Sequence, residues 1–245
     1  MSLQFRSLLK PDVRTKAFIC GCGHSGTSLL ANILAGHPDI YVPLRETNTF
    51  LKPMSVKWRL WNLLREAKAS GSPVMVEKTP RHIHHMDLIR RLVPGARFIL
   101  PVRDGRDVAA SIRKRSGKLA SSIERWIKDN SIVAAERGKQ DVLVYRHEDF
   151  VAEPGKWLQD ICNFIEVEYS NSLLDYHKQP KAWEGIKDLK QTDGVGKRHL
   201  QNRAWQVNQP IFDNSGRWRK ELTEADVAPL TTGEGSSLMR SFGYL

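Results

Sequence analysis

The chain has 245 residues, of which 40% are hydrophobic and 27% charged, and its formal net charge is +11. Its size and balance are those of one globular domain spanning residues 1–245. No apolar run reaches the length of a membrane span, and the opening residues lack the apolar core of a secretory signal. We therefore expect a cytoplasmic protein, although a catalytic domain cut from a membrane-anchored parent would show the same sequence features.

Apolar runs bounded by turn residues predict four strands, at 16–21, 74–77, Arg97–Val102 and 142–145. Helical periodicity lies between and after them, at 26–36, 55–68, 82–92, 106–116, 122–137, 156–164 and 171–177. This alternation predicts a three-layer α/β fold, with a central parallel sheet flanked by helices. From residue 179 to 213 the pattern weakens, which indicates an irregular loop or lid, or a surface excursion anchored by Trp183 and Trp205.

A glycine-rich segment after the first predicted strand nearly matches a phosphate-binding loop. Against G-x-x-x-x-G-K-[ST], Gly21 and Gly26 fall on the glycines and Ser28 on the hydroxyl, but Thr27 replaces the lysine. The N–H groups and the dipole of the following helix can still hold an anion if cations come from elsewhere. Read alone, the segment is equally a tight turn between a strand and a helix.

Two later strands end in cations. Lys78 closes one strand, and Arg103 follows another, with Ser111 about two helical turns further on. Ligands of an open parallel sheet bind at the carboxyl ends of its strands, so these groups can face the same crevice as the glycine-rich loop. An arginine and a hydroxyl at this spacing suit one phosphate group.

The positive charge and the cysteines limit the ligands. The charge attracts anions, but the basic residues are scattered and no nucleic-acid-binding motif is present, so a nucleotide or a sulfated or phosphorylated substrate explains the charge as well as nucleic acid does, and no nucleic-acid partner is expected. Cys20, Cys22 and His24 could be arranged as metal ligands, but small packing residues on a buried strand are the favoured interpretation, so no metal is expected. Three cysteines cannot all pair, which favours a reducing compartment.

Six blocks in order, "GCGHSGTSLL", "HPDIYVPLRETNTFL", "VEKTP", "FILPVRDGRDVAASI", "VYRHEDFVAEP" and "GRWRKEL", resemble the sulfotransferases that use 3′-phosphoadenosine 5′-phosphosulfate (PAPS). Within that family the resemblance is closest to the Golgi-type and bacterial branches that act on glycans and protein tyrosine. It implies a fold like that of P-loop NTPases, PAPS as sulfonate donor, and 3′,5′-adenosine bisphosphate (PAP) as product. It also accounts for Thr27, because the phosphosulfate loop of this family lacks the kinase lysine.

The resemblance also implies residue roles. Lys78 would contact the bridging oxygen of the donor, Arg103 and Ser111 would bind its 3′-phosphate, and Arg217 would add a later phosphate contact. The residues expected to cradle the 5′-phosphosulfate are Gly23, His24, Ser25, Gly26, Thr27 and Ser28. Family members usually carry Lys or Arg at the position of His24, which would bind either as a cation or as a neutral donor.

The family uses histidine or glutamate as the base. Pro80 occupies the place of the histidine of small-molecule members, so Glu46 in "LRETNTF" is the better match, with His82, His84 and His85 as the next candidates. A carboxylate at that place can accept the proton of an attacking hydroxyl, although it can also be a mere partner of Arg45. The acceptor hydroxyl, on a glycan, a tyrosine or a small alcohol, belongs to a molecule that can itself be anionic.

The sequence leaves two other functions open. A nucleotide kinase would need the missing loop lysine and an acidic residue for magnesium. A non-catalytic nucleic-acid-binding domain would use the +11 charge and would show a steep salt dependence.

Overall fold

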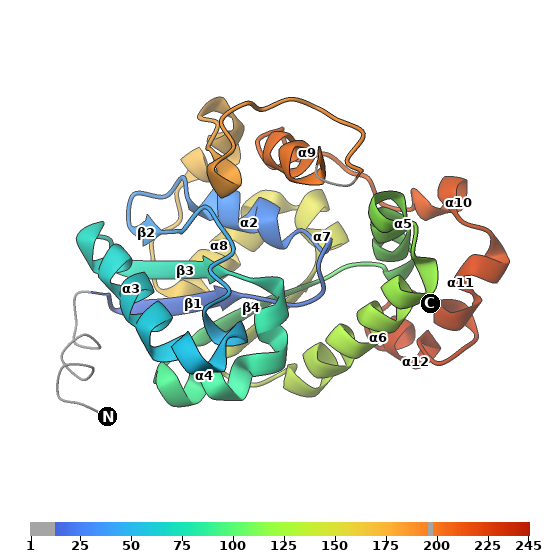
Figure 1. The fold of residues 1–245 in the computed structure, drawn as a ribbon, viewed down its shortest axis with the longest axis horizontal. Coiled ribbons are helices and arrows are strands. Elements are labelled where there is room, and N and C mark those ends of the chain that lie inside the picture. The colour runs from blue at the N-terminus through green and yellow to red at the C-terminus, as the bar shows by residue number, and fades with distance from the viewer. Residues whose placement is uncertain (1–12, 196–197) are drawn as a thin grey trace.

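The computed structural model describes residues 13–195 and 198–245, which fold around a five-stranded parallel sheet (Figure 1). The strands are β1 (Thr15–Ile19), β2 (Ile40–Tyr41), β3 (Val74–Lys78), β4 (Arg97–Val102) and β5 (Val142–Arg146). Their order is β2-β3-β1-β4-β5, so β1 lies in the centre. Because helices cover both faces of the sheet, every residue of β1 and β3 is buried.

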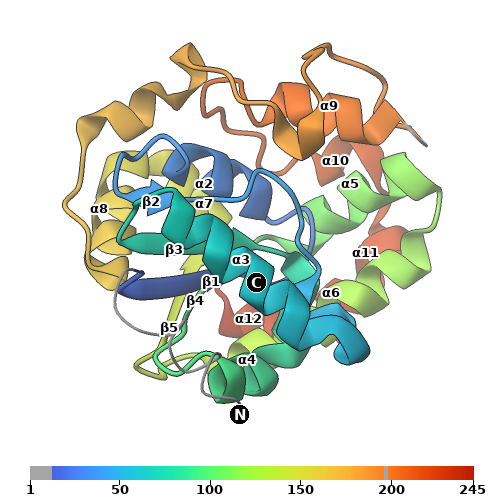
Figure 2. The ribbon, with the colours of Figure 1, turned by 60° about the vertical axis from the view of Figure 1, so that its left-hand side comes forward.

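Successive side chains of β1 point to two different cores. Ala17 and Ile19 pack under one helical layer, whereas Phe18 packs against the other. The first layer contains α2 (Thr27–Leu34), α7 (His147–Ala152) and α8 (Pro154–Ile165), and the second contains α3 (Val56–Ala69), α4 (Met86–Leu92) and α6 (Leu119–Glu136). Figure 2 shows the sheet between these two layers.

A third cluster lies beyond the carboxyl end of β4. There α5 (Gly105–Ser116) packs with α6 and with the last helices, α10 (Trp218–Glu221), α11 (Glu224–Thr231) and α12 (Ser236–Ser241). Trp126 of α6 is fully buried in this cluster, and its Nε1 donates to the Arg103 carbonyl over 2.9 Å. The cluster therefore holds the connection from β4 to α5 in place.

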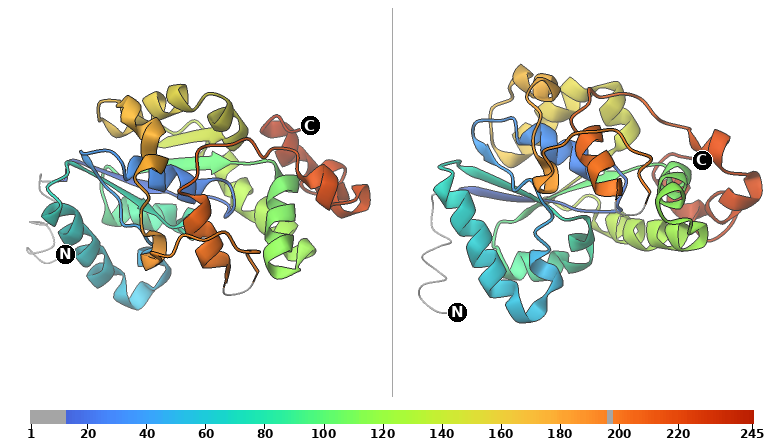
Figure 3. Two further views of the ribbon diagram at one scale, coloured as in Figure 1. Left: turned by 90° about the horizontal axis from the view of Figure 1, so that it is seen from above. Right: turned by 45° about the horizontal axis from the view of Figure 1, so that its top comes forward.

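The segment 179–213 crosses the carboxyl edge of the sheet, as the views in Figure 3 show. It contains the short 3₁₀ helix η5 (Trp183–Gly185) and the helix α9 (Arg198–Gln206). Trp183 is fully buried and Ala204 lies in the same core, so the segment is anchored at two points. The helix α9 interrupts the predicted irregular region, and of the two predicted anchors Trp183 is buried whereas Trp205 is only partly buried. Residues 196–197 lie outside the described part.

The predicted parallel sheet between two helical layers is confirmed, and the four predicted strands agree with the structure to within two residues at each end. Strand β2 was not predicted because two residues carry no periodic signal. The predicted helix 82–92 is split, because the chain from Pro80 to His85 forms the 3₁₀ helix η3 before α4. The predicted helix 171–177 is also a 3₁₀ helix, η4 (Asn171–Lys178). Two further 3₁₀ helices, η1 (Thr49–Leu51) and η2 (Pro53–Ser55), precede α3.

Candidate active site

Three neighbouring strands deliver the candidate residues to one edge of the sheet. Ile19, the last residue of β1, is in register with Lys78 of β3 and with Ile99 of β4. The glycine-rich loop leaves β1 at this edge, Lys78 ends β3, and Arg103 follows β4. The sheet order thus places the loop between the two cations, at the shared edge that the strand ends predicted.

The glycine-rich loop is shaped by backbone conformations that favour glycine. Gly26 has a φ of 87° and immediately precedes the first residue of α2, Thr27. A Cβ atom at Gly26 would lie 2.5 Å from Nδ1 of His147, the residue that follows β5. The loop therefore packs directly against the carboxyl end of β5, and only glycine fits this position.

A cavity of about 470 Å³ lies above the loop and carries several cations. Six of the loop and strand-end residues predicted as donor-binding line it, namely Gly23, His24, Gly26, Thr27, Ser28 and Arg103. Ser111 and the predicted base Glu46 line it as well. Ser25 and Lys78 are fully buried behind this lining, and Arg217 lies outside it, paired with Glu221 at 2.8 Å.

His24 and Ser111 meet at the far side of the loop. The His24 Nδ1 lies 2.8 Å from the Ser111 hydroxyl, and the His24 carbonyl accepts from Arg103 over 3.3 Å. Burial lowers the pKa of His24 well below its usual value, and the nearby arginines, above all Arg203 and Arg115, lower it further. Of the two alternatives for His24, the structure thus favours the neutral imidazole.

Polar atoms without partners point to a ligand at this place. In the described residues, the Ser25 hydroxyl, Nε of Arg103 and Nε2 of His24 are buried and make no hydrogen bond. Buried polar groups are rarely left unpaired in a folded protein, so each such group calls for an explanation. The Ser25 hydroxyl and Nε of Arg103 can donate hydrogen bonds to phosphate oxygens, which fits the anion that the loop and the start of α2 attract.

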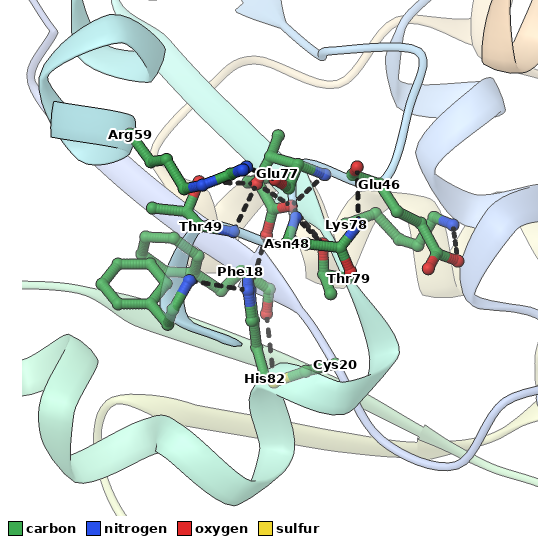
Figure 4. Close-up of polar contacts among 12 residues, drawn as sticks. Phe18, Cys20, Glu46, Asn48, Thr49, Arg59, Glu77, Lys78, Thr79 and His82 are labelled. Atoms are coloured by element: carbon green, nitrogen blue, oxygen red, sulfur yellow. Dashed lines mark hydrogen bonds and ion pairs between the residues drawn. The ribbon is translucent and has the colours of Figure 1, made fainter. Parts of the chain in front are cut away.

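Glu46, which lines the cavity, forms an ion pair with the buried Lys78 (Figure 4). Nζ of Lys78 lies 2.8 Å from Oε1 of Glu46 and 4.8 Å from the ring centre of Trp183. Arg203 of α9 also approaches the Glu46 carboxylate, at 3.5 Å. Burial lowers the pKa of Lys78, and the Glu46 carboxylate opposes that shift.

Several cavity residues were not predicted. Arg115 and Arg125 come from α5 and α6, Arg203 from α9, Arg81 from η3, and His147 from the start of α7. Burial and the neighbouring Arg103 lower the pKa of His147 to about 3, although Asp213 opposes them, so its ring is neutral. No local motif marks these residues, because they meet only when α5, α6 and α9 close over the edge of the sheet.

Neither a candidate metal centre nor a membrane-spanning helix occurs in the described residues. No group of three or more His, Cys, Asp or Glu side chains in residues 13–195 and 198–245 is placed to hold a metal ion. Within the same ranges, no helix is both long and apolar enough to cross a membrane.

Comparison with known proteins identifies similar sequences and folds. Residues 53–171 match the model of the Sulfotransferase family. A "Putative protein-tyrosine sulfotransferase" of Caenorhabditis briggsae is 24% identical over 76% of this chain and 78% of its own length. Against other curated relatives, the chain spans as little as 50% of their length.

Solved structures share the fold. The "Sulfotransferase Domain from the Synechococcus PCC 7002 Olefin Synthase" aligns with a TM-score of 0.63 at 20% identity, over 95% of both chains. "Mouse sulfotransferase SULT7A1 complexed with PAP" aligns with a TM-score of 0.61 at 16% identity, over 96% of this chain and 89% of its own. The expected resemblance to P-loop-like α/β structures is thereby confirmed at the level of the fold.

Proposed function

We propose that the chain is a sulfotransferase that takes sulfonate groups from PAPS in the cavity above the glycine-rich loop, because its sequence is similar to the sulfotransferase family. One observation carries the proposal. At one edge of the sheet, a phosphate-binding loop without lysine lies beside the arginines that line the cavity and beside the Lys78–Glu46 pair. The comparisons favour this activity over a nucleotide kinase and over a nucleic-acid-binding domain.

We assign different roles in donor binding and sulfonate transfer to the residues of the site. The loop N–H groups and the start of α2 would hold the 5′-phosphosulfate, while Arg103 and Ser111 would hold the 3′-phosphate. When bound, PAPS supplies the sulfonate group and PAP is the product. Lys78 would stabilise the negative charge that develops on the phosphate side, and Glu46 would accept the proton of the acceptor hydroxyl. Arg217, which pairs with Glu221, would have to leave that partner to reach the donor.

The acceptor has a separate place to bind. A second cavity of about 720 Å³ shares Glu46, Asn48 and Arg81 with the first. Its other lining includes Arg45, Lys52, Arg59 and the exposed ring of Trp58. The cations outnumber the carboxylates of Glu46 and Glu66, so we propose an anionic acceptor whose hydroxyl reaches Glu46 from this side.

We further propose a reducing compartment such as the cytoplasm. All three cysteines of the chain are buried and free, so no disulfide contributes to the fold.

Nucleotide binding tests the donor assignment. PAP should bind about ten- to a hundredfold more tightly than 5′-AMP, because a charge-assisted phosphate contact contributes about 1.5–3 kcal/mol. Arg103→Ala should remove most of this preference, as measured by calorimetry. The matched control is Arg113→Ala, since Arg113 lies on α5 but pairs with Asp226 outside the cavity. Equal affinity of the wild type for PAP and 5′-AMP would refute the assignment.

A further inference from the structure

The segment that carries Glu46 is held almost entirely by side chains. Residues 46–50 lie between β2 and α3, outside the ladders of the sheet. Their five consecutive backbone N–H groups donate, in order, to the side chains of Glu184, Glu77, Thr79, Thr47 and His82, over 2.9–3.4 Å. The Leu51 N–H donates to the Asn48 carbonyl in η1, but this bond joins the segment only to itself, so the position of the segment in the fold depends on the side-chain acceptors.

Four of the five acceptors belong to one network centred on Glu77 (Figure 4). Oε1 of Glu77 accepts from the hydroxyls of Thr47 at 2.8 Å and Thr79 at 2.6 Å, and Oε2 lies 2.9 Å from Nδ1 of His82. Because Nε2 of His82 accepts from the Phe50 N–H, the ring proton sits on Nδ1 and points at Glu77. Glu77 thus orients every other member of the network.

The network is buried and charged. Glu77, Thr79 and His82 have no exposed surface. Burial alone would raise the pKa of Glu77, but His82 and the hydroxyl donors outweigh it and lower that pKa, so the group is a carboxylate near neutral pH. A buried carboxylate is costly unless its oxygens are fully paired, and here they are.

Glu77 and Lys78 are neighbours on β3 and act on Glu46 from opposite sides. Alternate residues of a strand point to opposite faces, so Glu77 reaches the backbone beyond Glu46 while Lys78 reaches its carboxylate. We propose that Glu77 is a positioning residue of the transfer reaction, which acts through Thr47, Thr79 and His82 to hold the Glu46 carboxylate at the junction of the two cavities. This inference rests on the proposed function, because it takes Glu46 as the base.

A double-mutant cycle tests the inference. Glu77→Gln keeps the side-chain shape but breaks the pairing with His82, and it should lower kcat about ten- to a hundredfold, since small displacements of a reacting group cost up to about 10²-fold. The affinity for PAP should change less than about twofold. In the Glu46→Gln background, Glu77→Gln should lower the remaining rate by less than about twofold, because its effect passes through Glu46. The control Glu136→Gln removes a carboxylate that pairs with Arg90 away from both cavities and should leave kcat unchanged.

The possible results separate the two hypotheses. A slow Glu46→Gln enzyme combined with an additive or absent effect of Glu77→Gln would overturn the positioning role alone. Normal turnover of Glu46→Gln would overturn Glu46 as the base and, with it, the premise of the inference. If Glu77→Gln fails to fold, Thr79→Ser and Thr79→Val decide the question. The serine variant, which keeps the hydroxyl, should retain its rate and the valine variant should lose it, and equal rates of these two would refute the inference.

Discussion

Lys78 carries its charge without exposed surface, and two opposing neighbours set its pKa. Burial lowers that pKa from its usual value, and the Glu46 carboxylate, 2.8 Å away, raises it. In the proposed site, the protonated amine is the form that would attract the donor phosphate. The affinity for PAP should therefore fall as the pH rises toward a value below the usual lysine range.

Glu46→Gln should move this alkaline loss of PAP affinity to lower pH, because it removes the carboxylate that favours the charged amine. Calorimetric titrations of both proteins with PAP from about pH 7 to 10 measure the effect. Identical profiles for the two proteins would show that the amine does not bind the product.

At the scale of elements, the glycine-rich loop and α7 are packed too closely for any side chain at Gly26. Gly26→Ala places a Cβ atom 2.5 Å from His147 Nδ1 and strains a residue whose φ is 87°. We expect a loss of PAP affinity of at least about tenfold and a stability loss of about 1–3 kcal/mol, since strain of this kind has that cost. Gly117→Ala is the control, because Gly117 has a φ of 70° but an open surrounding.

Denaturant unfolding and PAP titration of the two variants separate strain from contact. Gly117→Ala should lose stability through strain alone and keep its affinity for PAP. Equal PAP affinity of Gly26→Ala and the wild type would mean that the loop does not hold the nucleotide.

The sequence predicted best those strands and helices whose hydrophobic residues recur with a regular period. The four longer strands alternate with predicted helices, which was enough to predict the sheet, the parallel direction of its strands and the shared edge of Lys78 and Arg103, but not the order of the strands. Strand β2 and the 3₁₀ helices η1, η2 and η5 were missed because they are short, whereas η3 and η4 overlap predicted helices and differ only in the type of helix. The last helices, α10 to α12, were missed because they pack as a group on α5 and α6, which is a tertiary effect.

The residues of the candidate site also fall into a predicted and an unpredicted group. The loop, Arg103, Ser111 and Glu46 lie in recognisable blocks and line the cavity. Arg115, Arg125 and Arg203 reach it only through the packing of three helices, and no spacing along the chain links them. No role was predicted for Glu77, because in the sequence it is simply one residue of a buried strand.

At the scale of the whole molecule, the cysteines are shielded from reaction. Burial raises the pKa of Cys162 to about 11 and also raises those of Cys20 and Cys22, so none is a thiolate near neutral pH. The native protein should react with a thiol reagent at none of its three cysteines, and the denatured protein at all three. Spectrophotometric thiol counting with and without denaturant measures this, and a rapidly reacting thiol in the native state would contradict the packing.

The position of Glu46 between two cavities bears on the kinetics of the enzyme. If the nucleotide fills one cavity and the acceptor the other, neither molecule has to depart before the other arrives. Both can then be present together, and the sulfonate passes between them in a single displacement without resting on the protein. Such an arrangement allows either substrate to bind first. The two cavities would then be linked by Glu46, which both of them share, and not by a covalent intermediate.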